Sequence, residues 1–158
     1  MPWFLILLLA LGAALIYAKL SYKPNIHETS FKKEFDNFKL KYAANLKEEP
    51  DLMDVVEGVE VKALVFCAQK PLAFPENVDY RQRTYDLVLT YLISKIVSSR
   101  SPQKVAKLFT TDKSNKYIQF YNFLMEDARQ NNIITEEQYQ RGLATLKTTL
   151  TSGPAAKE

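Results

Sequence analysis

The sequence predicts an all-α protein, with a single N-terminal transmembrane helix followed by a compact helical bundle of about five helices. Three observations support this prediction. The residues from Pro2 to Ala18 are uncharged and almost entirely apolar. In the rest of the chain, apolar residues recur mostly at intervals of three and four, the spacing of one helical face. The chain is 47% hydrophobic and 25% charged, which is typical of a folded protein.

These patterns divide the chain into four parts. We expect a transmembrane anchor at 1–20, a juxtamembrane linker at 21–28, an all-α soluble domain at 29–150 and a flexible tail at 151–158. The third part is long enough to bury one hydrophobic core. A single domain behind a membrane anchor is therefore the expected organisation.

The apolar N-terminal segment has the length of a membrane span. At ~1.5 Å of rise per residue, its helix just crosses a hydrocarbon core of ~30 Å. Trp3 and Tyr17 lie at its two ends, where amphipathic rings favour the headgroup level. A cleavable signal peptide and a soluble core helix are the alternatives. The segment lacks the positive n-region of the first and the polar face of the second, so we favour the anchor.

The flanking charges predict how the anchor is oriented. Lys19, Lys23, Lys32 and Lys33 follow the segment, and no Lys or Arg precedes it. The positive-inside rule then retains the C-terminal side, which gives an N-out topology with a cytoplasmic domain. An outward-facing domain is the alternative, because the rule is statistical.

Small residues line one face of the predicted anchor. Ala10, Ala14 and Ala18 recur at a spacing of four, which leaves this face free of bulky side chains. Such a face allows two membrane helices to pack closely. The alternative is that alanine is simply common in apolar segments. We retain these three residues as a candidate membrane packing face.

An aromatic stripe marks the first helix of the soluble domain. Phe31, Phe35, Phe38 and Tyr42 fall on one helical face, and Thr29 or Ser30 would cap that helix. We expect the stripe to pack into the core, as in any bundle helix. Two functional alternatives are a helix that lies on the membrane surface and a stripe presented to a partner helix.

Four further helices follow in order. Asp51 would cap the next one, although alternating residues at 59–65 also fit a strand. Asn77 would cap a helix that is apolar around most of its girth, as expected of a central buried helix. Pro102, directly after Ser101, begins a short helix in the favoured order of cap and proline. A longer amphipathic helix begins near Tyr117.

A turn near residue 133 gives the clearest local pattern. Ile133 and Ile134 would plug the turn, and Thr135 with Gln138 would form a capping box for the last helix. The sequence therefore predicts an αα-hairpin at this point.

The same stretch, over about 123–147, resembles the short C-terminal helical hairpins of bacterial proteins known as SHOCT domains, which carry a comparable Ile-Thr-Glu-Glu turn. It departs from them at Asn132, where a glycine is usual, and at Gly142, where a basic residue is common. The resemblance implies interaction or oligomerisation at most.

The sequence contains no motif that predicts catalysis. It has no glycine-rich phosphate loop and no His-rich metal spacing, so we expect no enzyme, no cofactor and no metal. Cys67 is most simply a buried hydrophobic residue, and a nucleophilic pair with His27, the single histidine, is the alternative. The net charge of +3 and the scattered lysines do not predict nucleic-acid binding.

The expected function is that of a single-pass, membrane-anchored helical adaptor, assembly factor or accessory subunit of a membrane protein complex. Its expected partners are the lipid bilayer, another membrane or membrane-associated protein, and a second copy of the chain. One alternative is an exported or outward-facing helical domain that binds a ligand in an apolar pocket between helices. The other is an anchored enzyme of unrecognised type, with a cleft that gathers distant acids.

Overall fold

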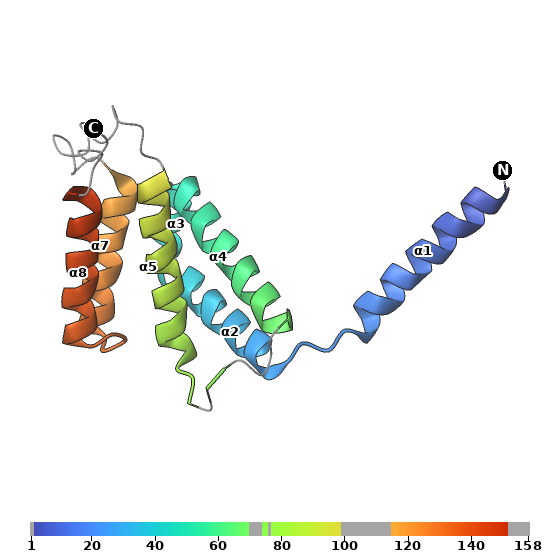
Figure 1. Cartoon of the computed structure of the whole chain (residues 1–158), viewed down its shortest axis with the longest axis horizontal. Helices are drawn as coiled ribbons and strands as arrows, with labels where there is room; N and C mark the ends of the chain where they lie inside the picture. The colour runs from blue at the N-terminus through green and yellow to red at the C-terminus, as the bar shows by residue number, and fades with distance from the viewer. Residues whose placement is uncertain (1, 70–73, 76, 99–114, 152–158) are drawn as a thin grey trace, which may run out of the picture.

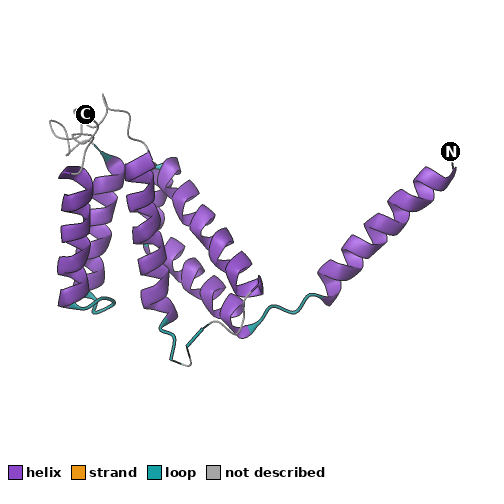
Figure 2. Ribbon diagram, in the orientation of Figure 1, coloured by secondary structure: helices purple, strands orange, loops and turns teal. Residues whose placement is uncertain are grey.

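The computed structural model describes residues 2–69, 74–75, 77–98 and 115–151 (Figure 1). Every regular element in these ranges is a helix, which confirms the all-α prediction (Figure 2). The helices are α1 (Pro2–Ser21), α2 (Ile26–Lys41), α3 (Ala43–Glu48), α4 (Pro50–Gln69), α5 (Tyr80–Ser98), α7 (Lys116–Gln130) and α8 (Glu136–Thr151). The short helix expected at 102–109 and most of the expected tail at 151–158 lie outside the described residues.

The N-terminal helix α1 stands apart from the bundle formed by the other helices (Figure 1). None of its residues is buried, although its mean hydropathy over an 18-residue window is 2.2. It is long and apolar enough to span a membrane, and an N-terminal signal sequence meets the same criteria. An exposed apolar helix of this length needs a hydrophobic environment that the bundle does not supply.

The connection between α1 and the bundle is shorter than the sequence predicts. The expected linker at 21–28 and the expected cap at Thr29 or Ser30 place the start of α2 too late, because Asn25 caps it instead. The Asn25 side chain accepts the backbone N–H groups of His27 and Glu28 at 2.9 and 3.0 Å. The Glu28 carboxylate accepts the Asn25 N–H at 2.8 Å, which completes a capping box. Only residues 22–25 remain non-helical.

The aromatic stripe of α2 lies in the core of the bundle. Phe31, Phe35, Phe38 and Tyr42 are each at most 3% exposed. They pack against α4 and α5, which are the main neighbours of α2. The stripe is therefore not presented to lipid or to a partner helix, because its own bundle already covers it.

Three helix boundaries differ from the expected ones. Tyr42, which the sequence places on the helical stripe, lies just beyond α2, because its φ of −106° ends that helix before α3 begins. Pro50 is the first residue of α4, a position that a proline favours, and Asp51 is therefore not the cap. The Asp79 side chain accepts the N–H of Gln82 at 3.1 Å, so α5 starts after Asn77.

The order of packing places α5 at the centre. It contacts α2 and α4 on one side and α7 and α8 on the other (Figure 1). Residues 59–65 belong to α4, so the strand alternative for this stretch is wrong. The bundle is thus two helix layers that share α5.

The turn between α7 and α8 has the predicted capping box. The Thr135 hydroxyl accepts the Gln138 N–H at 3.2 Å, and the Gln138 amide oxygen accepts the Thr135 N–H at 2.8 Å. Asn132 has a φ of 53°, which suits the left-handed position after a helix. Its N–H and that of Ile133 donate to carbonyl oxygens of the last turn of α7, which forms a Schellman motif.

A buried carboxylate joins α4 to α2. Glu60 of α4 is 7% exposed, and its oxygens accept hydrogen bonds from Lys32 and Lys39 at 2.7 and 2.6 Å. Burial by itself would raise the pKa of Glu60, but the two lysines outweigh it, so this pKa lies below the usual range. The paired charges fix which face of α4 meets α2.

We predict that Phe35→Ala lowers the free energy of unfolding of the bundle more than any substitution of an exposed residue on α2 does. The side chain is fully buried, and Phe-to-Ala changes in cores cost about 3–5 kcal/mol. Leu40→Ala on the same helix is the matched control, because Leu40 is 75% exposed and its loss should cost at most about 0.5 kcal/mol. Urea unfolding of the full chain in detergent, followed by circular dichroism, measures both. Equal effects of the two changes would contradict the assigned core.

Candidate binding cleft

A cleft of about 740 Å³ runs between α4 and α5. On α4 it is lined by Val59, Lys62, Ala63, Phe66 and Cys67. On α5 it is lined by Arg83, Asp86, Leu87, Thr90, Tyr91 and Ser94. Both sets recur at intervals of three and four, so each helix offers one continuous face. In the view of Figure 1 the two helices diverge toward the end where α1 is attached.

Aromatic side chains line the cleft at this diverging end. Phe31 of α2, together with Phe74 and Pro75 of the α4–α5 connection, completes the lining. The Phe74 ring lies 5.9 Å from the Phe31 ring and 5.7 Å from the Phe66 ring, measured between centroids. Phe66 remains 46% exposed. The result is an apolar surface that the bundle leaves open.

The opposite end of the cleft is polar. The Lys62 ammonium lies 4.5 Å from the centroid of the Tyr91 ring and 3.4 Å from the Tyr91 hydroxyl, to which it donates. Thr90 and Ser94 are exposed on the same wall. Lys62 has no carboxylate partner among the described residues. This end therefore combines Lys62 with hydroxyl groups, and the Lys95 ammonium lies 5.6 Å from the centroid of the same Tyr91 ring.

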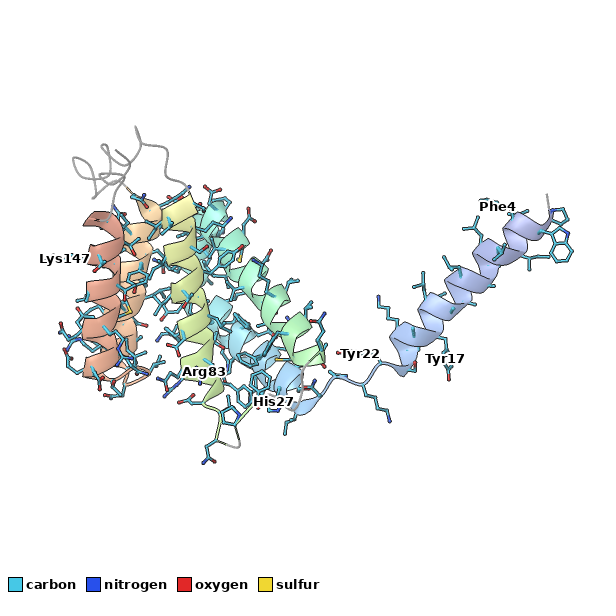
Figure 3. All side chains as sticks on the ribbon, viewed as in Figure 1. Phe4, Tyr17, Tyr22, His27, Arg83 and Lys147 are labelled. Carbon is cyan, nitrogen blue, oxygen red and sulfur yellow. The ribbon has the colours of Figure 1, made fainter. Side chains whose placement is uncertain are left out.

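Arg83 and Asp86 are charged side chains near the first turns of α5. Burial raises the pKa of the Asp86 carboxyl, and Arg83 acts in the opposite direction. Arg83 lies at the end of the bundle where the linker joins, as does His27 (Figure 3). Both residues line the cleft, and Arg83 only partly counters the effect of burial on the pKa of Asp86.

The linker to α1 directly contacts the walls of the cleft. The Asn25 side-chain amide donates to the carbonyl oxygen of Cys67 at 2.8 Å. The His27 ring stacks on Phe74 with centroids 4.3 Å apart. Tyr22, within the linker, donates from its hydroxyl to Glu28. The aromatic end of the cleft is thus the end nearest to the apolar helix α1.

The cleft has no arrangement of groups that suggests bond-breaking chemistry. Cys67 is 1% exposed, and burial raises the pKa of its thiol, which keeps the thiol protonated. His27 shares a hydrogen bond of 2.6 Å with the Tyr80 hydroxyl and is not paired with Cys67. Among the described residues, no group of three or more His, Cys, Asp or Glu side chains is placed to hold a metal ion.

A second polar cluster lies between α2, α5 and α7. The hydroxyls of Tyr42 and Tyr85 share a hydrogen bond of 2.5 Å, and Tyr42 also donates to Asp127. Lys41 pairs with the same carboxylate at 2.7 Å. Burial and these two hydrogen bonds raise the pKa of Tyr42 far above its usual range. Because these side chains are hydrogen-bond or ion-pair partners of one another, the cluster is best explained as a structural link between three helices.

The residues that the sequence singled out are placed apart. Ala10, Ala14 and Ala18 lie exposed on α1, away from the cleft. Of the aromatic stripe on α2, only Phe31 reaches the cleft lining. The sequence patterns did not predict a cleft between α4 and α5. A usable hint was Phe74, an aromatic residue in a proline-containing connection.

No family model, no curated protein and no solved structure matches this chain. The description of the cleft therefore depends on its own residues and geometry.

Proposed function

We propose that this chain is a membrane-anchored, non-enzymatic binding protein that holds an apolar group in the α4–α5 cleft. The cleft is the observation that carries this proposal. Its volume of about 740 Å³ falls in the range of ligand sites, ~300–1,000 Å³. Ligand sites also combine apolar walls with a few polar groups, as this cleft does. Binding an apolar group, rather than transforming it, agrees with the protonated, buried thiol of Cys67.

The exposed side chains along the cleft supply the driving force. Phe66 on α4 and Leu87 on α5 both line the cleft and are 46% and 38% exposed. Covering apolar surface is favourable by roughly 25 cal/mol per Å². Neither side chain belongs to the buried core, so a guest can cover both without rearranging the bundle.

We predict that a photoreactive acyl probe labels this cleft. The full chain would be placed in phosphatidylcholine nanodiscs with a fatty acid that carries a diazirine on its chain. After irradiation, peptide mass spectrometry should find adducts on cleft residues such as Phe66 and Leu87. Leu40, exposed on α2 and outside the cleft lining, reports non-specific labelling.

A blocking variant makes this test specific. Thr90→Trp places a large side chain on the exposed wall of α5, and the cleft labelling should fall at least about fivefold. Leu40→Trp, a matched change outside the cleft, should leave the labelling unchanged. Labelling of Leu40 as strong as that of Phe66 in the unmodified chain would show that the cleft holds no apolar guest.

A second candidate is an adaptor, assembly factor or accessory subunit that binds another membrane protein or a second copy of itself. Two exposed features favour it. Val61 and Val65 form a row on α4 and are 60% and 49% exposed. On α1, the small-residue face at Ala10, Ala14 and Ala18 would let another membrane helix approach closely.

We predict that this α1 face crosslinks to a protein more strongly than the opposite face does. Ala14 and Ile16 lie about 160° apart around the helix. Replacing each with benzoylphenylalanine and irradiating intact membranes should give a discrete adduct from position 14 and little from position 16. An adduct of twice the chain mass identifies a second copy, and another mass identifies a different subunit. Equal yields from both faces would contradict a specific packing face.

For topology, we propose that the N-terminus faces outward and that the domain is cytoplasmic. The proposal is supported by the lysines that follow α1, among them Lys19 and Lys23. Asn122→Cys adds an exposed thiol on α7, whereas the native Cys67 is buried. A membrane-impermeant maleimide should label Asn122→Cys only after cells are permeabilised. Labelling of intact cells would place the domain outside.

A further inference from the structure

We infer that the guest of the α4–α5 cleft is a single-chain amphiphile with an anionic head group, taken up from the host bilayer. This inference rests on the proposed function that the cleft holds an apolar group. It adds the number of chains, the charge of the head group and the direction in which the guest lies.

The length of the cleft fits one acyl chain. Along α5 the lining extends from Arg83 to Ser94, which corresponds to about 16 Å of helix. An acyl chain spans one half of the ~30 Å hydrocarbon core, or about 15 Å. The cleft runs between two neighbouring helices, so its length, rather than its volume, is the dimension that one acyl chain matches.

The position of the cleft places it beside the bilayer, which contains such chains. Its aromatic end contacts the linker through Cys67, whose carbonyl accepts from Asn25, and contacts the first turn of α2 through Phe74, which stacks on His27. The linker residues 22–25 reach at most about 14 Å even when fully extended. With α1 in the bilayer, the aromatic end must therefore stay close to the membrane surface.

The polarity of the cleft sets the direction of the guest. The aromatic end, with Phe31, Phe66 and Phe74, lies at the linker, and the polar end, with Lys62 and Tyr91, lies farther from the linker along α4 and α5. A lipid in the nearest leaflet also points its chain toward the membrane core and its head group outward. A single-chain amphiphile can therefore move from leaflet to cleft without turning over.

The polar end selects an anion. Lys62 has no carboxylate partner among the described residues, in contrast to Lys32 and Lys39, which both pair with Glu60. The exposed hydroxyls of Thr90 and Ser94 can donate hydrogen bonds to the same group. A fatty-acid carboxylate and a lysophospholipid phosphate share the required chemistry.

Asp86 is the acidic residue of the lining and would oppose an anion. It lies on α5 one turn from Arg83, whose charge acts on it. Lys62 is level with Tyr91, more than one turn further along α5. Lys62 is therefore the cation of the lining that a head group at the polar end meets, and Lys95 lies on the same Tyr91 ring without being part of the lining.

The test measures competition against the photoreactive fatty acid in phosphatidylcholine nanodiscs containing the full chain. The competitors are a fatty acid, a lysophosphatidic acid and a fatty alcohol of equal chain length, at equal mole fraction in the bilayer. Both anions should compete roughly threefold to fivefold better than the alcohol, the effect expected of one partly exposed charge pair. The better of the two anions identifies the source of the head group.

Two variants assign this preference to one end of the cleft. Lys62→Gln should reduce the preference for anions to about one, and Arg83→Gln, the same charge change at the aromatic end, should retain it. An alcohol that competes as well as both anions, while cleft labelling persists, overturns the inference and leaves the proposed function standing. Loss of the preference in Arg83→Gln but not in Lys62→Gln overturns the assigned direction. Absence of cleft labelling in the unmodified chain refutes the proposed function itself.

Discussion

Burial of the aromatic stripe on α2 is the constraint on which the rest of the domain depends. Phe35 and Phe38 fill the space between α4 and α5, so both helices are positioned by contact with α2. Glu60 fixes the rotation of α4 through its two lysine partners, and Tyr42 links α2 to α5 and α7. At the N-terminal end of the stripe, Phe31 is shared between the core and the cleft. The arrangement that makes the bundle stable therefore also holds the aromatic end of the cleft open.

The attachment to α1 lies directly beside the aromatic end of this cleft. A capping box at Asn25 starts α2 only four residues after α1 ends, and the same asparagine bonds to the carbonyl of Cys67 on α4. His27 then stacks on Phe74 in the connection to α5. These contacts tie the linker and the first turn of α2 to the elements that surround the aromatic end. The end of the cleft where apolar surface remains exposed therefore lies beside the attachment of α1.

Local patterns in the sequence predicted much of the fold. The spacing of the aromatic residues on α2 identified a buried face, and Thr135 with Gln138 identified the start of α8, because both depend on neighbours within one turn. The cap at Asn25 was missed because Glu28 was assigned to a linker, although Asn and Glu three residues apart fit a capping box. The cleft could not be predicted, since it depends on the angle between α4 and α5. Leu87 has the same spacing whether a neighbouring helix covers it or diverges from it.

We propose that the bundle binds a lipid-like guest between α4 and α5. The most direct measurement is native mass spectrometry of the full chain, extracted from its own membranes in a mild detergent and released from the micelle in the gas phase. The account predicts a bound species with the mass of one single-chain anionic amphiphile, retained at energies that strip detergent and lost when Thr90→Trp fills the cleft. A chain that is released without any bound amphiphile, or that keeps the same species in Thr90→Trp, would contradict it.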